Sequence, residues 1–371
     1  MSEIQDIVTG VVAHFSVPPG PVSVCQTGEG HINRSWLVTV HGPGGDSPYL
    51  LQRLNEAVFS DPLRVMENIV NVTEHLGAAV RRESFADPDR RALRLVPTLG
   101  GNPYHCGETA SVWRLYPFIT DTKVREHATT FEEAREVGRA YGAFQRLLAD
   151  YRGPRLHETI PRFHDTLGRV NALEQAVRAD RVGRSRPAAA EIEHLLAARD
   201  RARVLPPLLA RGELPERIAH NDAKSSNVLL DAATGAAVCV VDLDTVMPGS
   251  LLFDFGDMVR SSTSPTAEDE ENLDVVGLRL PLFEGLAAGY QEAAASILTE
   301  AERDLLAFSG ILITYEQALR FLTDHLDGDR YYRTTRADHN LVRCRAQMRL
   351  FDSLVAHEEE LREIVERTAV R

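Results

Sequence analysis

The segment IAHNDAKSSNVLL, residues 218–230, decides the fold that we predict for this chain. It places a histidine, an aspartate two positions later and an asparagine five positions after that directly before an apolar run. A second segment, AVCVVDLD at residues 237–244, is an apolar run that stops at Asp242. Turn-forming residues at 232–235 predict a hairpin between the two runs, which would bring Asp242 back beside Asn227.

These residue types match the needs of phosphoryl transfer from ATP. One carboxylate must orient the attacking hydroxyl and accept its proton, while an amide oxygen and a second carboxylate hold magnesium against the phosphates. We therefore predict Asp222 as the catalytic residue, and Asn227 and Asp242 as the magnesium ligands. Each segment alone would also fit an ordinary turn or strand end. Both segments in this order, behind a glycine-bearing β-rich region, favour the kinase interpretation.

The remainder of the chain predicts two parts of different character. Residues 1–118 contain short apolar strands, turn residues and one helix, which indicates a small antiparallel β lobe. From residue 119 to residue 371, apolar residues recur at helical spacing. We predict an α+β fold in which the first lobe binds nucleotide and the second carries the catalytic and substrate residues. The hinge between them is expected near residues 113–119.

Composition excludes several classes of protein. The chain is 43% hydrophobic and 26% charged, which is too apolar for a largely disordered protein. Its net charge of −13 argues against binding to nucleic acid or to anionic membranes. It has neither a long apolar run nor a signal-peptide pattern, and its four cysteines lie far apart. We therefore expect a cytoplasmic protein with reduced thiols.

Longer motifs resemble the aminoglycoside phosphotransferase/choline kinase superfamily, which has the two-lobed protein kinase fold. More narrowly, the chain is similar to the N-acetylhexosamine 1-kinases, chiefly in DLDTVMPG and RFLTDHL. The similarity spans most of the chain. The motifs are GEGHIN (28–33), LLQRLN (50–55), MENI (66–69), WRLYPFI (113–119), HNDAKSSN (220–227), VVDLDTVMPG (240–249), DFGDMVR (254–260), ALRFLTDHL (318–326) and GDRYY (328–332).

The expected phosphate contacts lie in the β lobe. Gly28 and Gly30 permit a close backbone approach to the phosphates. Kinases usually place a lysine on the third strand, but this strand has none. Because side chains alternate along a strand, either Gln52 or Arg53 would face the nucleotide. We prefer Arg53 for its charge, with Glu67 as its candidate ion-pair partner.

Further nucleotide contacts are expected outside that strand. The hinge segment would bring Tyr116 and Phe118 to the adenine, although a plain core strand ended by proline fits the same residues. Lys224 would supply positive charge near the γ-phosphate. Asp254 begins a literal DFG triplet, the magnesium motif of protein kinases, but the residues before it do not predict a strand that pairs back toward Asn227. We therefore assign Asp254 to the start of a helix, where it caps that helix or braces the catalytic loop.

The resemblance also implies an acceptor site. It places Arg320 and Tyr331 in a sugar pocket, where the arginine's fork can bind two hydroxyls or an acyl oxygen. Asp222 would contact the reacting hydroxyl. His31 and Asn33 would face the same pocket, and Asp244 either faces the sugar or braces its own loop. Ser261 stands where the resemblance leads us to expect an aromatic residue, so the identity of the sugar is left open.

The sequence thus predicts an ATP- and magnesium-dependent kinase of a small sugar. It would phosphorylate the anomeric hydroxyl of an N-acetylhexosamine or related hexose to the sugar 1-phosphate. One alternative is a kinase of another small alcohol, such as an aminoglycoside or a cyclitol. Another is a weakly active kinase-fold binding protein, which the missing strand lysine would favour. We expect no nucleic-acid or membrane partner, and we leave the oligomeric state open.

Overall fold

The computed structural model describes residues 2–27, 33–85, 87–107 and 111–370, and its backbone separates into two compact units. Two short segments from later in the chain, one of which carries Asp242, belong to the first unit. Unit 1 comprises Met1–Thr122, Tyr151–Ile160 and Val238–Met247, and unit 2 comprises Lys123–Asp150, Pro161–Ala237 and Pro248–Arg371.

Unit 1 is built on a five-stranded sheet in which every neighbouring pair is antiparallel. The strand order is β1-β2-β3-β5-β4, so β3 and β5 lie side by side near the middle. Their register pairs Gln52 with Arg114 and Leu51 with Leu115. The strands are β1 (Val22–Gln26), β2 (Arg34–Gly42), β3 (Gly45–Arg53), β4 (His105–Cys106) and β5 (Val112–Pro117).

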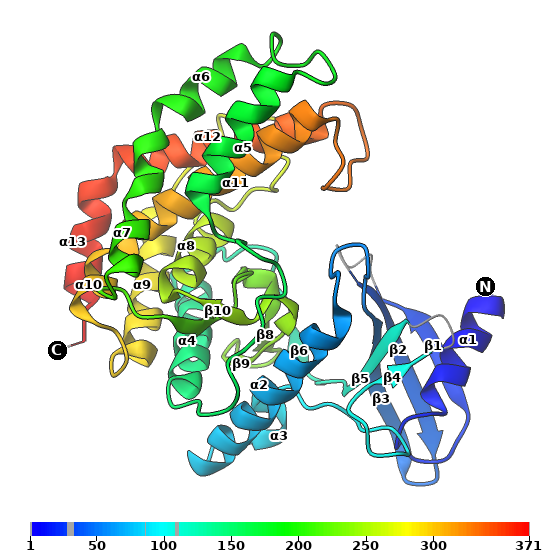
Figure 1. Ribbon diagram of the computed structural model, residues 1–371. Coiled ribbons are helices and arrows are strands. Elements are labelled where there is room, and N and C mark those ends of the chain that lie inside the picture. Colours follow the sequence, from blue (N-terminus) through cyan, green and yellow to red (C-terminus); the bar gives the residue numbers. More distant parts are fainter. Residues whose placement is uncertain (1, 28–32, 86, 108–110, 371) are drawn as a thin grey trace. The chain divides into compact units, whose positions relative to one another are not determined.

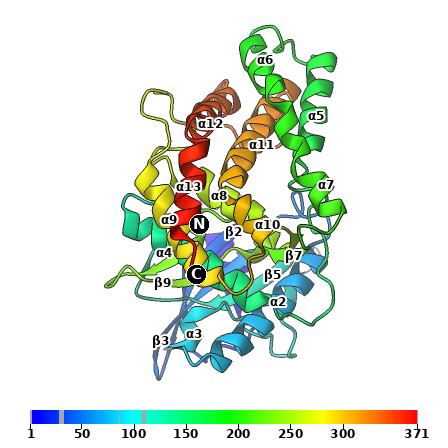
Figure 2. The ribbon, with the colours of Figure 1, turned by 90° about the vertical axis from the view of Figure 1, so that its left-hand side faces the viewer.

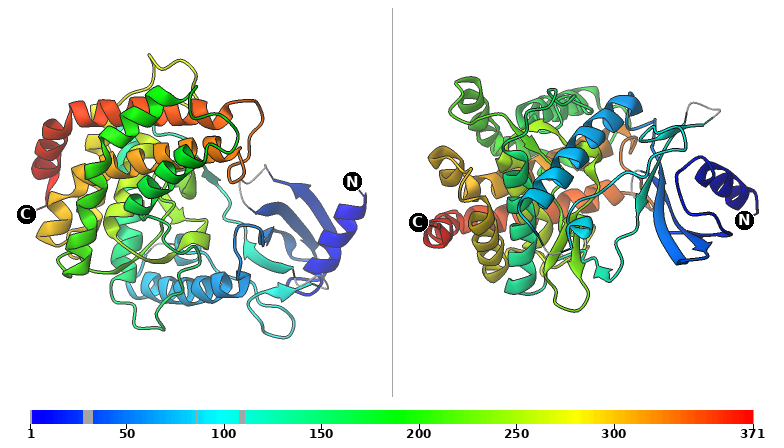
Figure 3. Two further views of the ribbon diagram at one scale, coloured as in Figure 1. Left: turned by 45° about the horizontal axis from the view of Figure 1, so that its top comes forward. Right: turned by 90° about the horizontal axis from the view of Figure 1, so that it is seen from below.

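The two faces of this sheet differ in chemistry. Helix α1 (Ser2–Val12) lies against the apolar face (Figures 1 and 3), where its buried residues pack with Leu51 and Leu115. Because side chains alternate along a strand, Gln52 and Arg114 point to the opposite face. The sheet therefore separates an apolar core on one side from a polar network on the other.

Helix α2 (Pro62–Arg82) fastens the two later segments of unit 1. Asp61 accepts a hydrogen bond at the start of this helix, as an N-cap residue does. Buried Asn68 donates through Nδ2 to the carbonyls of His157, at 2.8 Å, and Val246, at 3.0 Å. Its Oδ1 accepts from the His157 N–H at 2.8 Å, so one amide holds both segments.

Unit 2 is mainly helical. Its long helix α11 packs against α5, α8 and α12, and Figure 2 shows α12 beside α11. The helices are α4 (Phe131–Leu148), α5 (Thr166–Ala179), α6 (Ala189–Ala197), α7 (Leu205–Ala210), α8 (Leu251–Ser262), α9 (Leu280–Ala294), α10 (Glu300–Asp304), α11 (Leu306–Asp327), α12 (His339–Ala356) and α13 (Glu358–Thr368). The remaining elements are α3 (Pro88–Arg91), β6 (Thr122–Lys123), β7 (Arg217–Ala219), β8 (Val228–Asp231), β9 (Ala237–Val240) and β10 (Met247–Gly249).

The predicted α+β architecture, a small antiparallel sheet and a larger helical part, is confirmed. The predicted hairpin is present as β8 and β9, neighbours in the sheet β6-β8-β9, and its turn is closed by an Asp231 N–H to Ala236 carbonyl bond of 2.8 Å. Within the described ranges, no helix is both long and apolar enough to cross a bilayer.

Close contact between α4 and α9 depends on glycine. A Cβ at Gly138 would lie 2.2 Å from the carbonyl oxygen of Leu286 and 2.9 Å from the Tyr290 nitrogen. Gly289 on α9 is equally tight, because a Cβ there would lie 1.9 Å from the Arg135 carbonyl oxygen. The two helices therefore approach each other backbone to backbone, and this contact anchors the helix that runs behind the catalytic loop.

We expect Gly138→Ala to lower the free energy of unfolding by about 1–3 kcal/mol, because the new methyl group must displace backbone. Gly10→Ala is the matched control, since a Cβ on that helical glycine meets nothing within 4 Å. Because alanine has a better helix propensity than glycine, Gly10→Ala should leave the free energy of unfolding unchanged or raise it by up to ~1 kcal/mol. Denaturant unfolding of both variants measures the difference, and equal stabilities would contradict this account of the α4–α9 contact.

Candidate active site

The loop that carries Asp222 is fixed by a buried carboxylate. Oδ2 of Asp254 accepts the backbone N–H of His220 at 2.8 Å, and Oδ1 accepts that of Asn221 at 2.7 Å. Gln145 donates to the same carboxylate at 2.6 Å. The loop needs this support because Asn221 has a left-handed backbone with φ of 63°.

Asp254 therefore braces the catalytic loop and does not cap its helix. The N-cap of α8 is Ser250, whose Oγ accepts from the Leu252 N–H at 3.3 Å. Asp254 lies one turn into the helix and is fully buried. Burial raises the pKa of its carboxyl, and both oxygens are already bonded to the protein. The literal DFG triplet is thus a structural element of this loop.

Asp222, Lys224 and Asn227 are brought together in unit 2. The Lys224 Nζ lies 3.1 Å from Asp222 Oδ2. Asn227 Nδ2 donates to the same oxygen at 3.0 Å and to the Asp222 carbonyl at 2.9 Å. Burial alone would raise the pKa of Asp222, but Lys224, His220 and Arg260 lower it to about 2. The carboxylate is therefore held in its ionised form.

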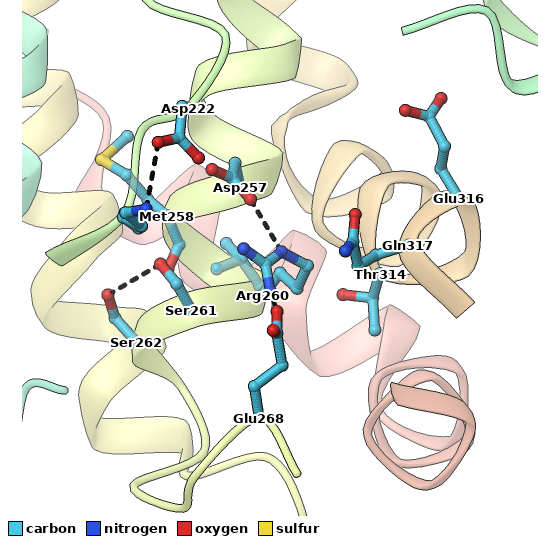
Figure 4. Close-up of polar contacts among 12 residues, drawn as sticks. Asp222, Asp257, Met258, Arg260, Ser261, Ser262, Glu268, Thr314, Glu316 and Gln317 are labelled. Carbon is cyan, nitrogen blue, oxygen red and sulfur yellow. Dashed lines mark hydrogen bonds and ion pairs between the residues drawn. The ribbon is translucent and has the colours of Figure 1, made fainter. Parts of the chain in front are cut away.

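A second cation, Arg260, lies near Asp222 on helix α8 (Figure 4). Its Nε bonds Asp257 at 2.7 Å, and its Nη1 bonds Glu268 at 3.0 Å. Burial lowers the pKa of Arg260, but the carboxylates around it raise that pKa above its ordinary value. The carboxylates of Asp257 and Glu268 are thus engaged by one guanidinium. The hydroxyl of Ser261, the next residue, donates to the Met258 carbonyl at 3.4 Å and lies 3.5 Å from the Ser262 hydroxyl.

Helix α11 is tied to the catalytic loop by a histidine that the sequence analysis did not identify. His164 contacts Glu316 through Nδ1 at 2.9 Å and the Asn221 carbonyl through Nε2 at 3.1 Å. Thr166 donates to the other oxygen of Glu316 at 2.5 Å. These bonds engage the Glu316 carboxylate. Burial raises its pKa, but His164 and Thr166 lower it by more, so the pKa lies below its ordinary value.

Arg320, one turn after Glu316, is surrounded by aromatic rings. Its Cζ lies 4.9 Å from the ring centre of Phe163, 5.9 Å from that of Tyr331 and 5.6 Å from that of Tyr332. The pairing of Arg320 with Tyr331 was expected, whereas Phe163 and Tyr332 were not singled out. Arg320 Nη1 also donates to Gln317 at 3.2 Å.

The segment with both tyrosines is anchored by Asp324. Its Oδ1 accepts the backbone N–H groups of Arg330 and Tyr331, at 2.9 and 2.8 Å. Its Oδ2 accepts that of Tyr332 at 3.0 Å. Helix α11 ends at Gly328, whose φ of 93° lets the chain turn back along the helix. The tyrosines are thus positioned by backbone bonds while Tyr331 keeps 59% of its surface exposed.

In unit 1 the central feature is Arg114, which the sequence analysis did not assign. Its guanidinium is buried and donates to Gln52 Oε1 through Nε at 3.0 Å and Nη2 at 2.8 Å. It also forms an ion pair with Asp244, and Asn33 donates to the other oxygen of that carboxylate. These contacts hold the loop that carries Asp244, as expected of a bracing residue, and the sugar contacts expected of Asn33 and Asp244 stay predictions.

Arg53 and Glu67, which were expected to pair near the nucleotide, lie apart in their contacts. The Cζ atom of Arg53 lies 5.8 Å from the ring centre of Trp113. Arg53 and Arg34 both line a polar hollow of about 350 Å³. Glu67 bonds His157 at 2.6 Å, so the pairing suggested between Glu67 and Arg53 is wrong.

The two hinge aromatics differ in exposure. Tyr116 is buried with its ring centre 5.4 Å from Arg114 Cζ, and 40% of Phe118 is exposed. Asp242 has a left-handed backbone, with φ of 62° and ψ of 59°. Gly28, Gly30 and His31 lie outside the described residues.

Comparison with known proteins gives the family. A family model described as the phosphotransferase enzyme family matches residues 23–296. An aminoglycoside phosphotransferase from Alicyclobacillus acidocaldarius is similar over 97% of this chain and 96% of its own, with 15% identity and a TM-score of 0.59.

Two other solved structures show the same fold. A spectinomycin phosphotransferase solved with ADP and spectinomycin aligns over 98% of each chain, at 11% identity and a TM-score of 0.56. A choline kinase from Cryptosporidium parvum aligns over 96% of each chain, at 12% identity and a TM-score of 0.51. At such identities the likeness shows the fold, which is the two-lobed, protein-kinase-like one predicted.

The brace formed by Asp254 can be tested with Asp254→Asn. The amide keeps one acceptor oxygen but loses the other, so we expect the free energy of unfolding to fall by about 1.5–3 kcal/mol. Magnesium-dependent nucleotide binding, measured by titration calorimetry, should persist. Ser250→Ala is the control in the same helix and should cost about 0.5–2 kcal/mol through loss of the cap. A variant of full stability that loses magnesium-dependent binding would show that Asp254 is a metal ligand.

The low pKa of Asp222 predicts a pH effect. Because the pKa is about 2, the residue is ionised above that value, and activity that needs the carboxylate is lost only as pH falls toward 2. Lys224→Gln removes the largest charge that lowers this pKa, so the acid limb of kcat should move upward by about one pH unit or more. Lys123→Gln is the control. Identical acid limbs in parent and Lys224→Gln would contradict the electrostatic account.

Proposed function

We propose that this chain, which belongs to the phosphotransferase enzyme family, is an ATP-dependent sugar kinase. It phosphorylates the anomeric hydroxyl of an N-acetylhexosamine or a related hexose and yields the sugar 1-phosphate. The observation that carries the choice of acceptor is the environment of Arg320, a partly buried guanidinium between the rings of Phe163, Tyr331 and Tyr332. Such a site offers hydrogen-bond donors and ring surfaces, which suit a neutral sugar.

In this proposal Asp222 orients the acceptor hydroxyl and accepts its proton. A carboxylate with a pKa of about 2 is a weak base, so its contribution is mainly to position the hydroxyl. That suits phosphoryl transfer, whose loose transition state needs positioning and charge stabilisation more than early proton removal. Lys224, bonded to Asp222, supplies positive charge for the γ-phosphate.

Asn227 and Asp242 are the proposed magnesium ligands. Both bonds from Asn227 to Asp222 use the amide nitrogen, so neither uses the amide oxygen, the type of atom that magnesium prefers. Asp242 contributes a carboxylate on a left-handed turn. When bound, the ion would neutralise charge on the phosphates. The donor set therefore fits a hard cation.

Further contacts with the nucleotide are proposed for residues of the β lobe. Arg53 is the last residue of β3 and shares the strand face of Leu51, not that of Gln52. It is proposed to reach the phosphates from this strand end, where it borders a polar hollow together with Arg34. Gly28 and Gly30 are proposed to cradle the phosphates, with Tyr116 and Phe118 near the adenine. Gln52 is proposed to act on the nucleotide site only through Arg114, which donates two hydrogen bonds to its side-chain oxygen.

The charges of unit 2 argue against a polycationic acceptor. An aminoglycoside, which carries several ammonium groups, is expected to need carboxylates around it besides the catalytic one. Here Asp257 and Glu268 are engaged by Arg260, and Glu316 is engaged by His164 and Thr166. Arg260 and Arg320 add positive charge instead. A neutral N-acetylated sugar, with His31 as a further proposed contact, meets no such repulsion.

The test is a panel of acceptors assayed with magnesium ATP. The panel contains N-acetylglucosamine, N-acetylgalactosamine, glucose, galactose, a cyclitol, kanamycin and spectinomycin. We expect turnover with at least one neutral hexose or N-acetylhexosamine and a phosphorus NMR signal from an anomeric phosphate. Turnover of an aminoglycoside without any neutral hexose would overturn the choice of acceptor. ATP binding without turnover of any acceptor would favour a binding protein.

Arg320→Ala tests the acceptor site directly. Loss of a charged hydrogen-bond donor costs about 1.5–3 kcal/mol, so kcat/KM for the sugar should fall about 10- to 150-fold. The Michaelis constant for ATP should change little. Arg201→Ala is the matched control, because Arg201 also stacks over a ring, Phe351 at 5.9 Å, in the same unit. Equal effects of Arg320→Ala on sugar and ATP would remove Arg320 from the acceptor site.

A further inference from the structure

Arg114 is the largest side chain among the fully buried residues of the described chain, and it carries a charge. A buried guanidinium is costly unless its charge and its N–H groups are matched. Here Gln52 Oε1 accepts two of the N–H groups, Asp244 balances the charge, and the ring of Tyr116 covers one side. All four residues belong to unit 1, and the network lies on the sheet face opposite α1.

The network reaches the turn that holds Asp242. Asp244 lies two residues further on, inside the short 3-10 turn Leu243–Thr245. Asp242 itself adopts the left-handed conformation, which costs a non-glycine residue about 1–2 kcal/mol and persists only where neighbouring contacts enforce it. Within this turn the Asp244 carboxylate is held by an ion pair with Arg114 and a hydrogen bond from Asn33.

The ends of the turn are also held. Asn68 donates to the Val246 carbonyl at 3.0 Å, and Thr159 donates to the Asp244 carbonyl at 3.4 Å. Electrostatics agree with this arrangement. Burial lowers the pKa of Arg114, but Asp244 and, more weakly, Asp242 raise it well above its ordinary value. The guanidinium therefore acts on both aspartates.

We propose that Arg114 is a positioning residue for the magnesium site: through Asp244 it fixes the strained turn from which Asp242 presents its carboxylate. In this way a cation on β5 replaces the missing lysine of the third strand in organising the site. The inference rests on the proposed role of Asp242 as a ligand. It does not depend on which acceptor the enzyme uses.

The experiment measures binding of a non-hydrolysable ATP analogue by titration calorimetry over a series of magnesium concentrations. The variants are Arg114→Lys, Asp244→Asn and the double variant, each checked for folding by thermal denaturation without magnesium. Each single variant should raise the magnesium concentration for half-maximal binding about ten-fold or more, as expected for loss of a charged hydrogen bond. The double variant should be no weaker than the weaker single variant, because both remove the same contact.

Arg90→Lys is the matched control, since Arg90 belongs to unit 1 and donates to the carbonyls of Thr120, at 3.0 Å, and Asp121, at 3.3 Å. Its magnesium midpoint should equal that of the parent. An unchanged midpoint in Arg114→Lys and Asp244→Asn would overturn the inference. So would weaker binding by the same factor at every magnesium concentration, which would indicate direct contact with the nucleotide.

Asp242→Asn separates this inference from the proposed function. If Asp242→Asn abolishes the magnesium dependence while the Arg114 and Asp244 variants retain the parent midpoint, the positioning role alone is wrong. If Asp242→Asn also behaves as the parent, the assignment of Asp242 as a ligand fails. Should Arg114→Lys not fold, Asp244→Asn by itself decides between these outcomes, because it changes one atom and keeps the shape of the side chain.

Discussion

The buried carboxylate of Asp254, which accepts the backbone N–H groups of His220 and Asn221, is the interaction on which the loop with Asp222 depends. A loop with a left-handed residue is strained, and its N–H groups cannot be left unpaired in a dry interior. Two oxygens on one side chain satisfy two consecutive amides, which fixes the direction of the chain immediately before Asp222. The short spacing from Asp222 to Asn227 then suffices to bring those side chains into contact.

Charge pairing explains how similar residues in unit 2 come to have different roles. Asp222 lies near two cations and stays ionised, whereas Asp254 is surrounded by neutral donors and has its pKa raised by burial. Asp257 is committed to Arg260. Arg320, by contrast, is bounded mostly by rings, so its donors are not consumed by a carboxylate. Charge pairing thus distinguishes Asp222 and Arg320 from the neighbouring charged residues Asp257, Arg260 and Glu316.

The contacts that the sequence predicted are those set by short spacing or by a regular repeat. The hairpin after Asn227 and the helix at Asp254 follow from residues close together in the chain, whereas the placement of Arg320 with Tyr331 came from the family resemblance. Arg114 and His164 could not be assigned in this way. The role of Arg114 depends on the register of β3 against β5 and on a segment more than a hundred residues away. The only signal in the sequence is one arginine in an otherwise apolar strand.

The absence of a lysine on β3 has a structural explanation that is consistent with an active kinase. The position where β3 faces the polar side of the sheet is occupied by Gln52, an acceptor, and the cation stands opposite on β5. Arginine suits this position on β5 because its planar guanidinium can donate two N–H groups to one amide oxygen while a third N–H group reaches a carboxylate. A lysine at position 114 would have to choose between Gln52 and Asp244. Gln52 and Arg114 therefore act as a pair: the glutamine oxygen on β3 holds the guanidinium on β5, and that guanidinium holds Asp244.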